Sequence, residues 1–201
     1  MPAVLDAKAT ASKRKRSNVE KRPSKRVRSE SDDEDAQAEI LLLENEIFES
    51  KKHYNNIAKL IKILKDVDSE GSIVAAISLC RIFTRLMASG DLVKNKSTSE
   101  KEAVVIQWLR ERYSEYKQAL LVLLQQDGAG STVLTLAMRT LKSEGTHLLN
   151  GQDYCFPAVF LADILRALLR AQIDPAVRQE FSEKYVEEND DIRFYTYESL
   201  A

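Results

Sequence analysis

Residues 72–88 read SIVAAISLCRIFTRLMA, and this stretch decides the fold. Its length allows about five turns of an α-helix, and apolar residues fall on nearly every side of that helix. The exceptions form one polar stripe of Ser78, Arg81 and Arg85. A helix that is apolar almost all round is packed by neighbours on several sides. We therefore expect it at the centre of a multi-helix core, with Ile77 as a core residue whose replacement by Asp is severely destabilising.

Helical patterns continue on both sides of this stretch. Apolar residues recur at helical spacing in the segments 36–50, 55–65, 99–126, 131–145, 157–172 and 174–188. Ser99 with Glu102 fits a capping box, and Asp174 before Pro175 fits an N-cap followed by a proline in the first turn. Residues 189–201 are interpreted as irregular and aromatic. No segment alternates with period two, so the sequence predicts no sheet.

The order of these helices predicts an all-α fold. Six or seven helices are joined by short loops and recur at a spacing on the order of 20–30 residues, which suits a stack of antiparallel helix pairs. We therefore expect a HEAT-like stack of antiparallel helices, an α-solenoid. Because no repeated sequence signature is visible, a compact irregular bundle is the alternative.

Charge divides the chain into three parts, although the net charge of the 201 residues is only -1. Residues 1–28 carry a net charge of +8, residues 29–50 carry -9, and the remainder is neutral. Residues 1–38 are rich in Lys, Arg, Ser, Asp, Glu and Ala and contain no aromatic residue. Such a segment cannot bury enough apolar area to offset its ordering entropy. We predict a disordered, basic-then-acidic tail over 1–38, followed by a helical-repeat domain over 39–201.

The basic part of this tail is concentrated in residues 13–28. The clusters are Lys13, Arg14, Lys15 and Arg16, then Lys21 and Arg22, then Lys25, Arg26 and Arg28. Clusters separated by short spacers suit the acidic grooves of a nuclear import receptor, so they predict a nuclear protein. The same clusters could bind RNA phosphates by counterion release. The remaining interpretation is a solubilising tail without a specific partner.

The acidic part of the tail contains two serines that each have an acid three positions later. Ser29 precedes Asp32, and Ser31 precedes Glu34. This is the pattern that an acidophilic serine kinase reads, and phosphate there would deepen an already negative patch. We predict phosphorylation at Ser29 and Ser31, with a merely solvated charge run as the alternative.

Residues that carry chemistry are too sparse to build a catalytic site. The two histidines, His53 and His147, are far apart in sequence, and together with Cys80 and Cys155 they form no pair at the short spacing of a zinc site. No phosphate-binding or dinucleotide-binding glycine motif is present. No apolar run approaches the ~20 residues of a membrane-spanning helix. The sequence therefore predicts no enzyme, no cofactor or metal, no small-molecule substrate and no membrane partner.

Arginines on otherwise apolar helices are the candidate contacts with a partner. Arg81 and Arg85 form one stripe, and Arg166 and Arg170 form another. If both stripes line a common face, they would bind RNA phosphates or an acidic partner helix; the alternative is an ordinary solvent-exposed face. A further candidate docking edge, or packing surface for additional chain, is the aromatic cluster of Phe181, Tyr185, Phe194, Tyr195 and Tyr197.

Two short blocks of the sequence resemble a known family. Residues 49–57, ESKKHYNNI, and residues 189–195, NDDIRFY, are similar to blocks in the N-terminal region of the nucleolar complex protein four family, the small-subunit branch of the nucleolar complex/CCAAT-binding-factor group. The helices between them follow a similar order, so the resemblance spans about 36–197. Members of that family carry a larger C-terminal domain that is not in this sequence. We therefore expect residues 39–201 to be the N-terminal part of a longer protein.

The resemblance implies a non-enzymatic scaffold of the nucleolus. Such a protein would act in ribosome biogenesis, in assembly of the small-subunit processome and in pre-rRNA processing. It would pair stably with nucleolar protein fourteen, and direct contact with pre-rRNA is a further expectation. The charged tail and the helices by themselves also fit a chromatin- or transcription-associated helical adaptor, which is the alternative function.

Overall fold

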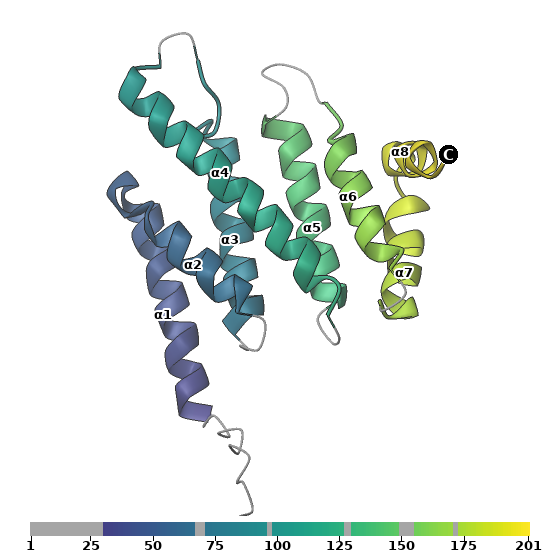
Figure 1. Ribbon diagram of the computed structural model, residues 1–201, viewed down its shortest axis with the longest axis horizontal. Coiled ribbons are helices and arrows are strands. Elements are labelled where there is room, and N and C mark those ends of the chain that lie inside the picture. The colour runs from purple at the N-terminus through teal and green to yellow at the C-terminus, as the bar shows by residue number, and fades with distance from the viewer. Residues whose placement is uncertain (1–29, 67–70, 96–97, 127–129, 149–154, 171–172) are drawn as a thin grey trace, which may run out of the picture.

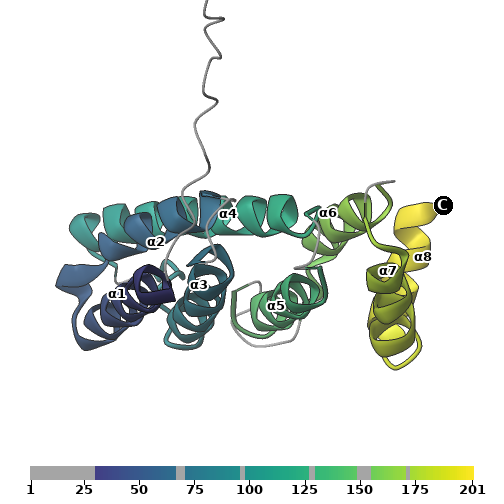
Figure 2. The same cartoon turned by 90° about the horizontal axis from the view of Figure 1, so that it is seen from below.

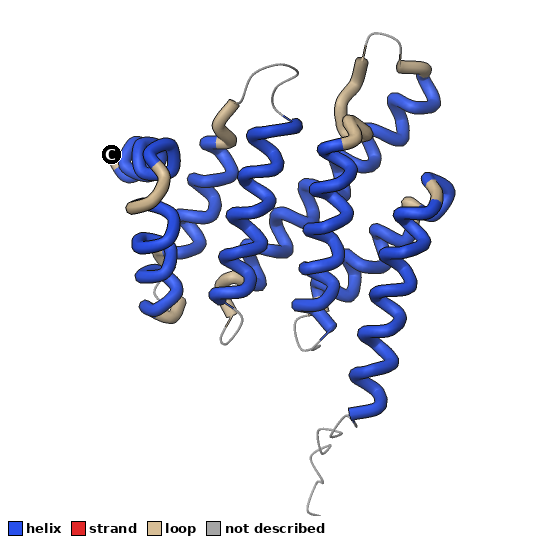
Figure 3. The backbone as a smooth tube through the Cα atoms, turned by 180° about the vertical axis from the view of Figure 1, so that it is seen from behind, coloured by secondary structure: helices blue, strands red, loops and turns tan. Residues whose placement is uncertain are grey.

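The computed structural model describes residues 30–66, 71–95, 98–126, 130–148, 155–170 and 173–201. Within these residues every regular element is helical (Figure 3). The eight α-helices are α1 (Glu30–Glu49), α2 (Asn56–Lys65), α3 (Gly71–Ala88), α4 (Glu100–Leu123), α5 (Gly130–Ser143), α6 (Ala158–Leu168), α7 (Pro175–Phe181) and α8 (Asp190–Leu200). Three short turns complete them: the 3-10 turn η1 (Lys51–His53) and the π-helical turns η2 (Glu144–Leu148) and η3 (Ser182–Val186).

The helices are arranged in two layers. Helices α1, α3, α5 and α7 pack side by side in the first layer, while α2, α4 and α6 form the second, and α8 packs on α6 (Figure 2). From α1 to α7 successive helices run in opposite directions, whereas α8 lies across the end of the stack (Figure 1). Each helix contacts mainly the helices one and two positions away, which is the packing of an α-solenoid. The predicted all-α stack of antiparallel helices is therefore confirmed.

Helix α3 is the core helix that its composition predicts. It contacts α1 and α5 in its own layer and α2 and α4 in the other layer. Its side chains Leu79, Ile82 and Phe83 are fully buried. Among the described residues it is also the helix that is long and apolar enough to cross a membrane by composition alone. Because most of it is buried inside the stack, this composition reflects its position in the core.

The open side of α3 differs from the expected one. Ile77 is only half-buried, whereas Ser78 is fully buried and accepts a hydrogen bond from Arg81 Nη2 at 3.3 Å. Ile77 packs against the core without being fully buried, so the severe destabilisation expected for Ile77→Asp stays a prediction, and Ser78 does not share the exposure of Arg81 and Arg85 in the polar stripe. When apolar residues surround a helix, their periodicity does not show which side the neighbouring helices leave uncovered.

Helix α1 begins earlier than the sequence analysis predicted. It starts at Glu30, so residues 30–38, which were assigned to the disordered tail, are helical. Acidic residues near a helix N-terminus are stabilised by the helix dipole, and neither glycine nor proline interrupts the segment. The buried core begins later, at Ile40, which is 1% exposed.

The C-terminal segment that was expected to be irregular is helix α8. Asn189 occupies the N-cap position with an extended backbone, and Asp190 and Asp191 lie in the first turn, where the helix dipole favours negative charge. Tyr195 anchors the helix by stacking on Phe156, with ring centroids 4.2 Å apart. This packing decides the structure of the segment, because its apolar residues do not form one clear stripe.

The predicted helix start signals are confirmed by hydrogen bonds. The Ser99 hydroxyl accepts from the Glu102 backbone N–H, and the Glu102 carboxylate accepts from the Ser99 backbone N–H at 2.9 Å. At α7, Asp174 Oδ1 accepts from the backbone N–H of Ala176 at 2.9 Å. These contacts satisfy backbone donors that the first helical turn leaves without partners.

Candidate interaction surface

One side of helices α3 and α5 in the first layer is open and carries positive charge. The residues of α3 that are not buried recur at helical spacing, and so do those of α5. Since the second layer and the lateral neighbours cover the other sides, both stripes face outward; we call this side the outer face. Its exposed charges on these helices are Arg81 and Arg85 from α3 and Arg139 and Lys142 from α5. Neither helix contains an Asp or a Glu.

Arg81 is engaged within the molecule. Its Nε donates to Oε1 of Glu44 at 2.6 Å and its Nη2 to Oε2 at 2.5 Å, a bidentate pair that joins α3 to α1. The hydrogen bond to Glu44 is the main reason that the pKa of Arg81 is raised, while burial opposes it. Glu44 is 5% exposed, so Arg81 compensates a nearly buried carboxylate. Arg81 is therefore a clamp between two helices.

Arg85 keeps its hydrogen-bond donors open to solvent. Its guanidinium carbon lies 4.7 Å from the centroid of the Phe48 ring of α1, a cation–π geometry. Across the described ranges it has no acidic partner within ion-pair distance. A stacked guanidinium with free edge donors is preorganised for a phosphate or a carboxylate.

The other predicted arginine pair lies in the second layer. Arg166 of α6 pairs with Asp163 of the same helix at 2.5 Å. Arg170, just after α6, donates to the side chain of Gln125, just after α4. The two predicted stripes therefore do not share a common face, because α3 and α6 belong to opposite layers. Sequence spacing shows which residues share a side of one helix, but it does not place helices in layers.

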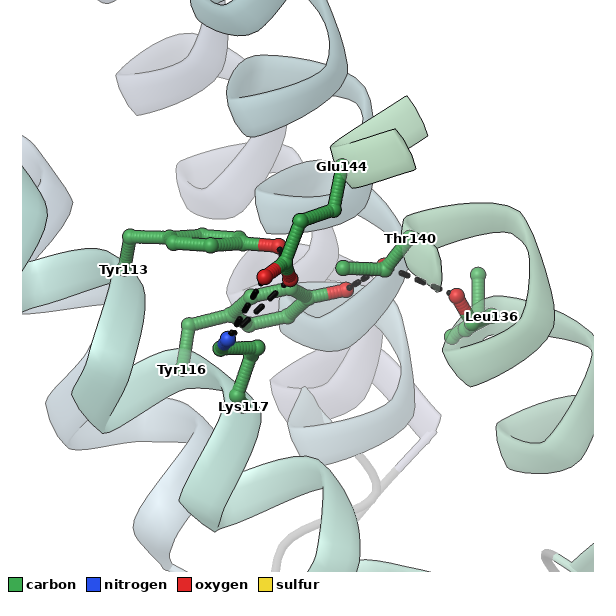
Figure 4. A network of polar contacts seen from close by, with 6 residues as sticks. All are labelled: Tyr113, Tyr116, Lys117, Leu136, Thr140 and Glu144. Atoms are coloured by element: carbon green, nitrogen blue, oxygen red, sulfur yellow. Dashed lines mark hydrogen bonds and ion pairs between the residues drawn. The ribbon is translucent and has the colours of Figure 1, made fainter. Parts of the chain in front are cut away.

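A buried polar network joins α4 to the π-helical turn η2 (Figure 4). Tyr113 Oη donates to Oε2 of Glu144 at 2.7 Å, and Lys117 Nζ donates to the two carboxylate oxygens at 3.0 and 3.3 Å. The same Nζ lies 4.9 and 4.8 Å from the ring centroids of Tyr113 and Phe160. Burial is the main cause that raises the pKa of Tyr113 well above its usual value, and the charge of Glu144 adds to it. The tyrosine is thus a neutral donor.

A second branch of the network is also satisfied internally. Thr140 Oγ1 donates to the backbone oxygen of Leu136 at 2.8 Å, so the fully buried Tyr116 hydroxyl, 3.3 Å away, donates to Thr140. Burial is the main cause that raises the pKa of Tyr116. These side chains hold α4 against α5. Their polar atoms are used in mutual hydrogen bonds, so the network is a structural element.

The remaining candidate residues for chemistry do not gather. His53 and His147 are exposed on separate turns, Cys80 is buried in α3, and Cys155 is exposed. Within the described ranges, no group of three or more His, Cys, Asp or Glu side chains could hold a metal ion.

The predicted aromatic cluster divides into a packed part and an exposed part. Phe181 is buried, and its ring centroid lies 6.2 Å from that of Tyr185. Tyr195 stacks on Phe156. Phe194 and Tyr197 are 62% and 63% exposed. The exposed pair gives α8 an aromatic outer side.

Of the tail residues predicted for nuclear targeting or phosphorylation, the structure describes only Ser31. Residues 13–28 and Ser29 lie outside the described residues, and Ser31 falls in the first turn of α1. Nuclear targeting and phosphorylation therefore stay predictions.

Comparison with known proteins identifies the family. The family described as nucleolar complex protein 4-like, TPR repeats, matches residues 29–201. The chain belongs to this family. The match includes all eight helices of the stack, so the resemblance predicted from the two sequence blocks is confirmed.

Two relatives share the nucleolar complex protein 4-like sequence at modest identity. A nucleolar complex protein 4 homolog from Danio rerio is 28% identical over 177 residues, which cover 77% of this chain and 32% of the relative. An uncharacterized protein from Schizosaccharomyces pombe is 28% identical over 165 residues, which cover 78% of this chain and 33% of the relative. The chain thus spans about a third of the length of these curated relatives.

Two cations of the outer face in this nucleolar complex protein 4-like chain were not predicted from the sequence. Arg139 and Lys142 lie on α5, where they are three positions apart and exposed. The usable signal was the complete lack of acids in residues 71–88 and 130–143. It shows two helices with cations alone, although only the structure shows that both face the same side.

Proposed function

We propose that the chain is a non-enzymatic scaffold in ribosome biogenesis, which acts in the nucleolus in small-subunit processome assembly and pre-rRNA processing. The observation that carries the proposal is the match of residues 29–201 to the nucleolar complex protein 4-like family. The two-layer stack supports it, because it offers long helix faces for partners while its buried polar network is satisfied internally. The mechanism is adhesive: helix faces hold partners in place.

The proposed protein partner is nucleolar protein fourteen, by family resemblance. For direct contact with pre-rRNA we assign Arg85, since its donors are open, whereas Arg81, Arg166 and Arg170 each have a partner within the chain. Arg85→Glu should lower ultraviolet cross-linking of the chain to pre-rRNA and reduce the salt dependence of binding. Arg166→Glu in the second layer is the matched control and should leave both unchanged.

Affinity purification of the tagged chain from its source cells tests the ribosome-assembly function. Small-subunit precursor rRNA should be enriched over an untagged control, together with nucleolar protein fourteen. Enrichment of promoter DNA without precursor rRNA would instead favour the chromatin- or transcription-associated adaptor.

Deletion of residues 13–28 tests nuclear targeting. The variant should lose nuclear accumulation, because it lacks all three basic clusters. Its melting temperature should stay unchanged, since the buried core begins at Ile40. A control that lacks residues 2–12 should remain nuclear. Nuclear accumulation of the 13–28 deletion, seen by fluorescence microscopy, would contradict the assignment.

Phosphorylation at Ser29 and Ser31 is proposed at the N-terminal end of α1. A phosphate at a helix N-terminus is stabilised by free backbone N–H groups and the helix dipole. Phosphopeptide mass spectrometry of the purified protein should find modification at these serines and not at Ser24, which has no acid three positions later. Unmodified Ser29 and Ser31 in protein from growing cells would contradict it.

A further inference from the structure

A groove of about 810 Å³ opens between α5 and the C-terminal elements η3 and α8. Its residues from α5 include Thr135, Arg139 and Lys142, which belong to the exposed stripe of the outer face. The opposite side is built by Lys184, Tyr185 and residues 188–192. Figure 2 shows α7 and α8 beyond α5 at the C-terminal end of the stack. The groove is large enough for the side chains of a bound protein segment.

The deeper lining of the groove is apolar. Met138 and Leu141 of α5 are 5% and 3% exposed, and Phe156, Tyr185 and Ile192 are partly buried beside them. Methionine and aromatic side chains adapt to the shape of a bound apolar group. The lining therefore suits leucine- or phenylalanine-sized side chains.

The two walls of the groove carry opposite charges. Arg139 and Lys142 project from α5, and Glu188 and Asp191 lie on the wall across from them. Over the residues that the structure describes, no ion pair crosses the groove. The neighbouring pairs Lys184–Glu180 and Arg193–Asp190 stay within the C-terminal wall. Six charged residues line the groove. Lys184 and Asp190 are engaged in these two pairs, so Arg139, Lys142, Glu188 and Asp191 are the charges left for an occupant of the groove.

Both π-helical turns found in the described residues, η2 and η3, border this groove. Thr146 from η2 lines one end, and Lys184 and Tyr185 from η3 line the other side. A π-helical turn interrupts regular α-helical hydrogen bonding and occurs often at functional sites. The position of the two π-helical turns is an observation independent of the charge pattern, and it indicates the same groove as a functional site.

We propose that this groove binds an amphipathic helix of a partner protein. The apolar side of that helix packs on the partly buried Phe156, Tyr185 and Ile192. Acidic residues on one flank pair with Arg139 and Lys142, and basic residues on the other flank face Glu188 and Asp191. This is recognition of a helix in a groove, with apolar anchors at helical spacing. A nucleic acid fits poorly, because its phosphates would meet Glu188 and Asp191.

The inference rests on the proposed scaffold function, for which it names a class of partner. The experiments below measure contact between the groove and a partner segment, and they do not measure ribosome assembly. Failure to recover precursor rRNA would therefore leave the groove assignment standing, and loss of the groove contact would leave the ribosome-assembly function standing.

Site-specific photo-cross-linking provides the first arm of the test. Benzoylphenylalanine replaces Thr135, which lines the groove without carrying charge, and Val159 of α6, 79% exposed in the second layer, is the control site. In cells, the Thr135 probe should cross-link to a partner segment that has apolar residues at helical spacing and acids beside them. A cross-link to RNA, to residues 1–29 of this chain or to a second copy, or no product above the Val159 control, would overturn the proposal.

Binding of the mapped segment, synthesised as a peptide, provides the second arm. Fluorescence anisotropy with the purified chain should show at least tenfold weaker binding for the double variant R139E/K142E, and similar affinity for the control R166E. Changing the acids of the peptide to Lys should restore binding to R139E/K142E, because the charge attraction is re-formed with opposite signs. All the substituted residues are exposed, and equal melting temperatures should verify folding. Unchanged affinity of R139E/K142E would overturn the proposal.

Discussion

Glu144 is a nearly buried carboxylate whose charge is compensated by one lysine. It is 7% exposed and accepts hydrogen bonds from Lys117 and Tyr113. Lys117→Met should destabilise the protein by about 3 kcal/mol, because loss of one partner leaves an uncompensated buried charge. Urea unfolding followed by circular dichroism measures the difference.

An exposed ion pair provides the control for this substitution. Lys65 lies 3.0 Å from Glu115, and 53% of its side chain is exposed. Glu115 also pairs with Arg112 at 2.7 Å. Lys65→Met should therefore change the free energy of unfolding by less than about 1 kcal/mol. Equal effects of the two lysine substitutions would show that burial of Glu144 does not increase the contribution of its ion pair to the free energy of unfolding.

Gly130 is required by close packing between α5 and α7. A Cβ atom at this position would lie 2.5 Å from Val177 Cγ2, and the short β-branched side chain has little freedom to move. Gly130→Ala should therefore destabilise the protein by about 1–3 kcal/mol. The double variant G130A/V177A should be destabilised by less than the sum of the two single variants in a double-mutant cycle. Additive losses would contradict the steric explanation.

At the scale of one element, the capping box of α4 makes stability depend on pH. The Ser99 backbone N–H, and then its hydroxyl, donate to Glu102 and lower the pKa of this carboxyl below its ordinary 4.5. A carboxyl whose pKa is lower in the folded protein stabilises it above the unfolded-state pKa, and this contribution is lost as the pH falls through the folded-state value. Wild type should therefore lose more stability than Glu102→Gln below about pH 4.5.

Urea unfolding midpoints measured between pH 7 and pH 3 test this dependence. Glu100→Gln is the matched control, since it removes a charge from the same helical turn and leaves the contacts of Ser99 and Glu102 in place. Its stability curve should follow that of wild type more closely. Parallel curves for wild type and Glu102→Gln would contradict the assignment.

At the scale of the whole molecule, most contacts reach one or two helices along the stack. Damage at one end should therefore spread less than damage at the centre. Phe181→Asp in α7 should increase amide hydrogen exchange in α7 and α8, while α1 to α3 keep their protection. Ile82→Asp at the centre of α3 should remove protection throughout, because α3 touches four helices.

Hydrogen-exchange mass spectrometry distinguishes these patterns. Ile77→Asp is the control for the central substitution, since Ile77 is half-buried on the outer face and tolerates a polar group better than the fully buried Ile82. Equal loss of protection from Phe181→Asp in every helix would show a single cooperative unit in place of a stack.

The sequence by itself determined the features that depend on local physics. Helical periodicity gave the helices from α2 to α7, and the residue types around Ser99 and Asp174 gave their caps, because these signals act within one or two turns. The two blocks at 49–57 and 189–195 pointed to the family that the comparison then showed.

Only the tertiary structure decided which sides of the helices are open. Ile77 is partly exposed and Ser78 is buried, the reverse of what their residue types suggest. Arg81 and Arg166 lie in opposite layers. Both outcomes depend on neighbours that lie far away along the chain. The groove also depends on packing between distant segments, because Arg139 lies on one wall and the residues of the other wall come about fifty positions later in the sequence. Periodicity within one helix defines its faces, and packing between distant helices determines which face remains for a partner.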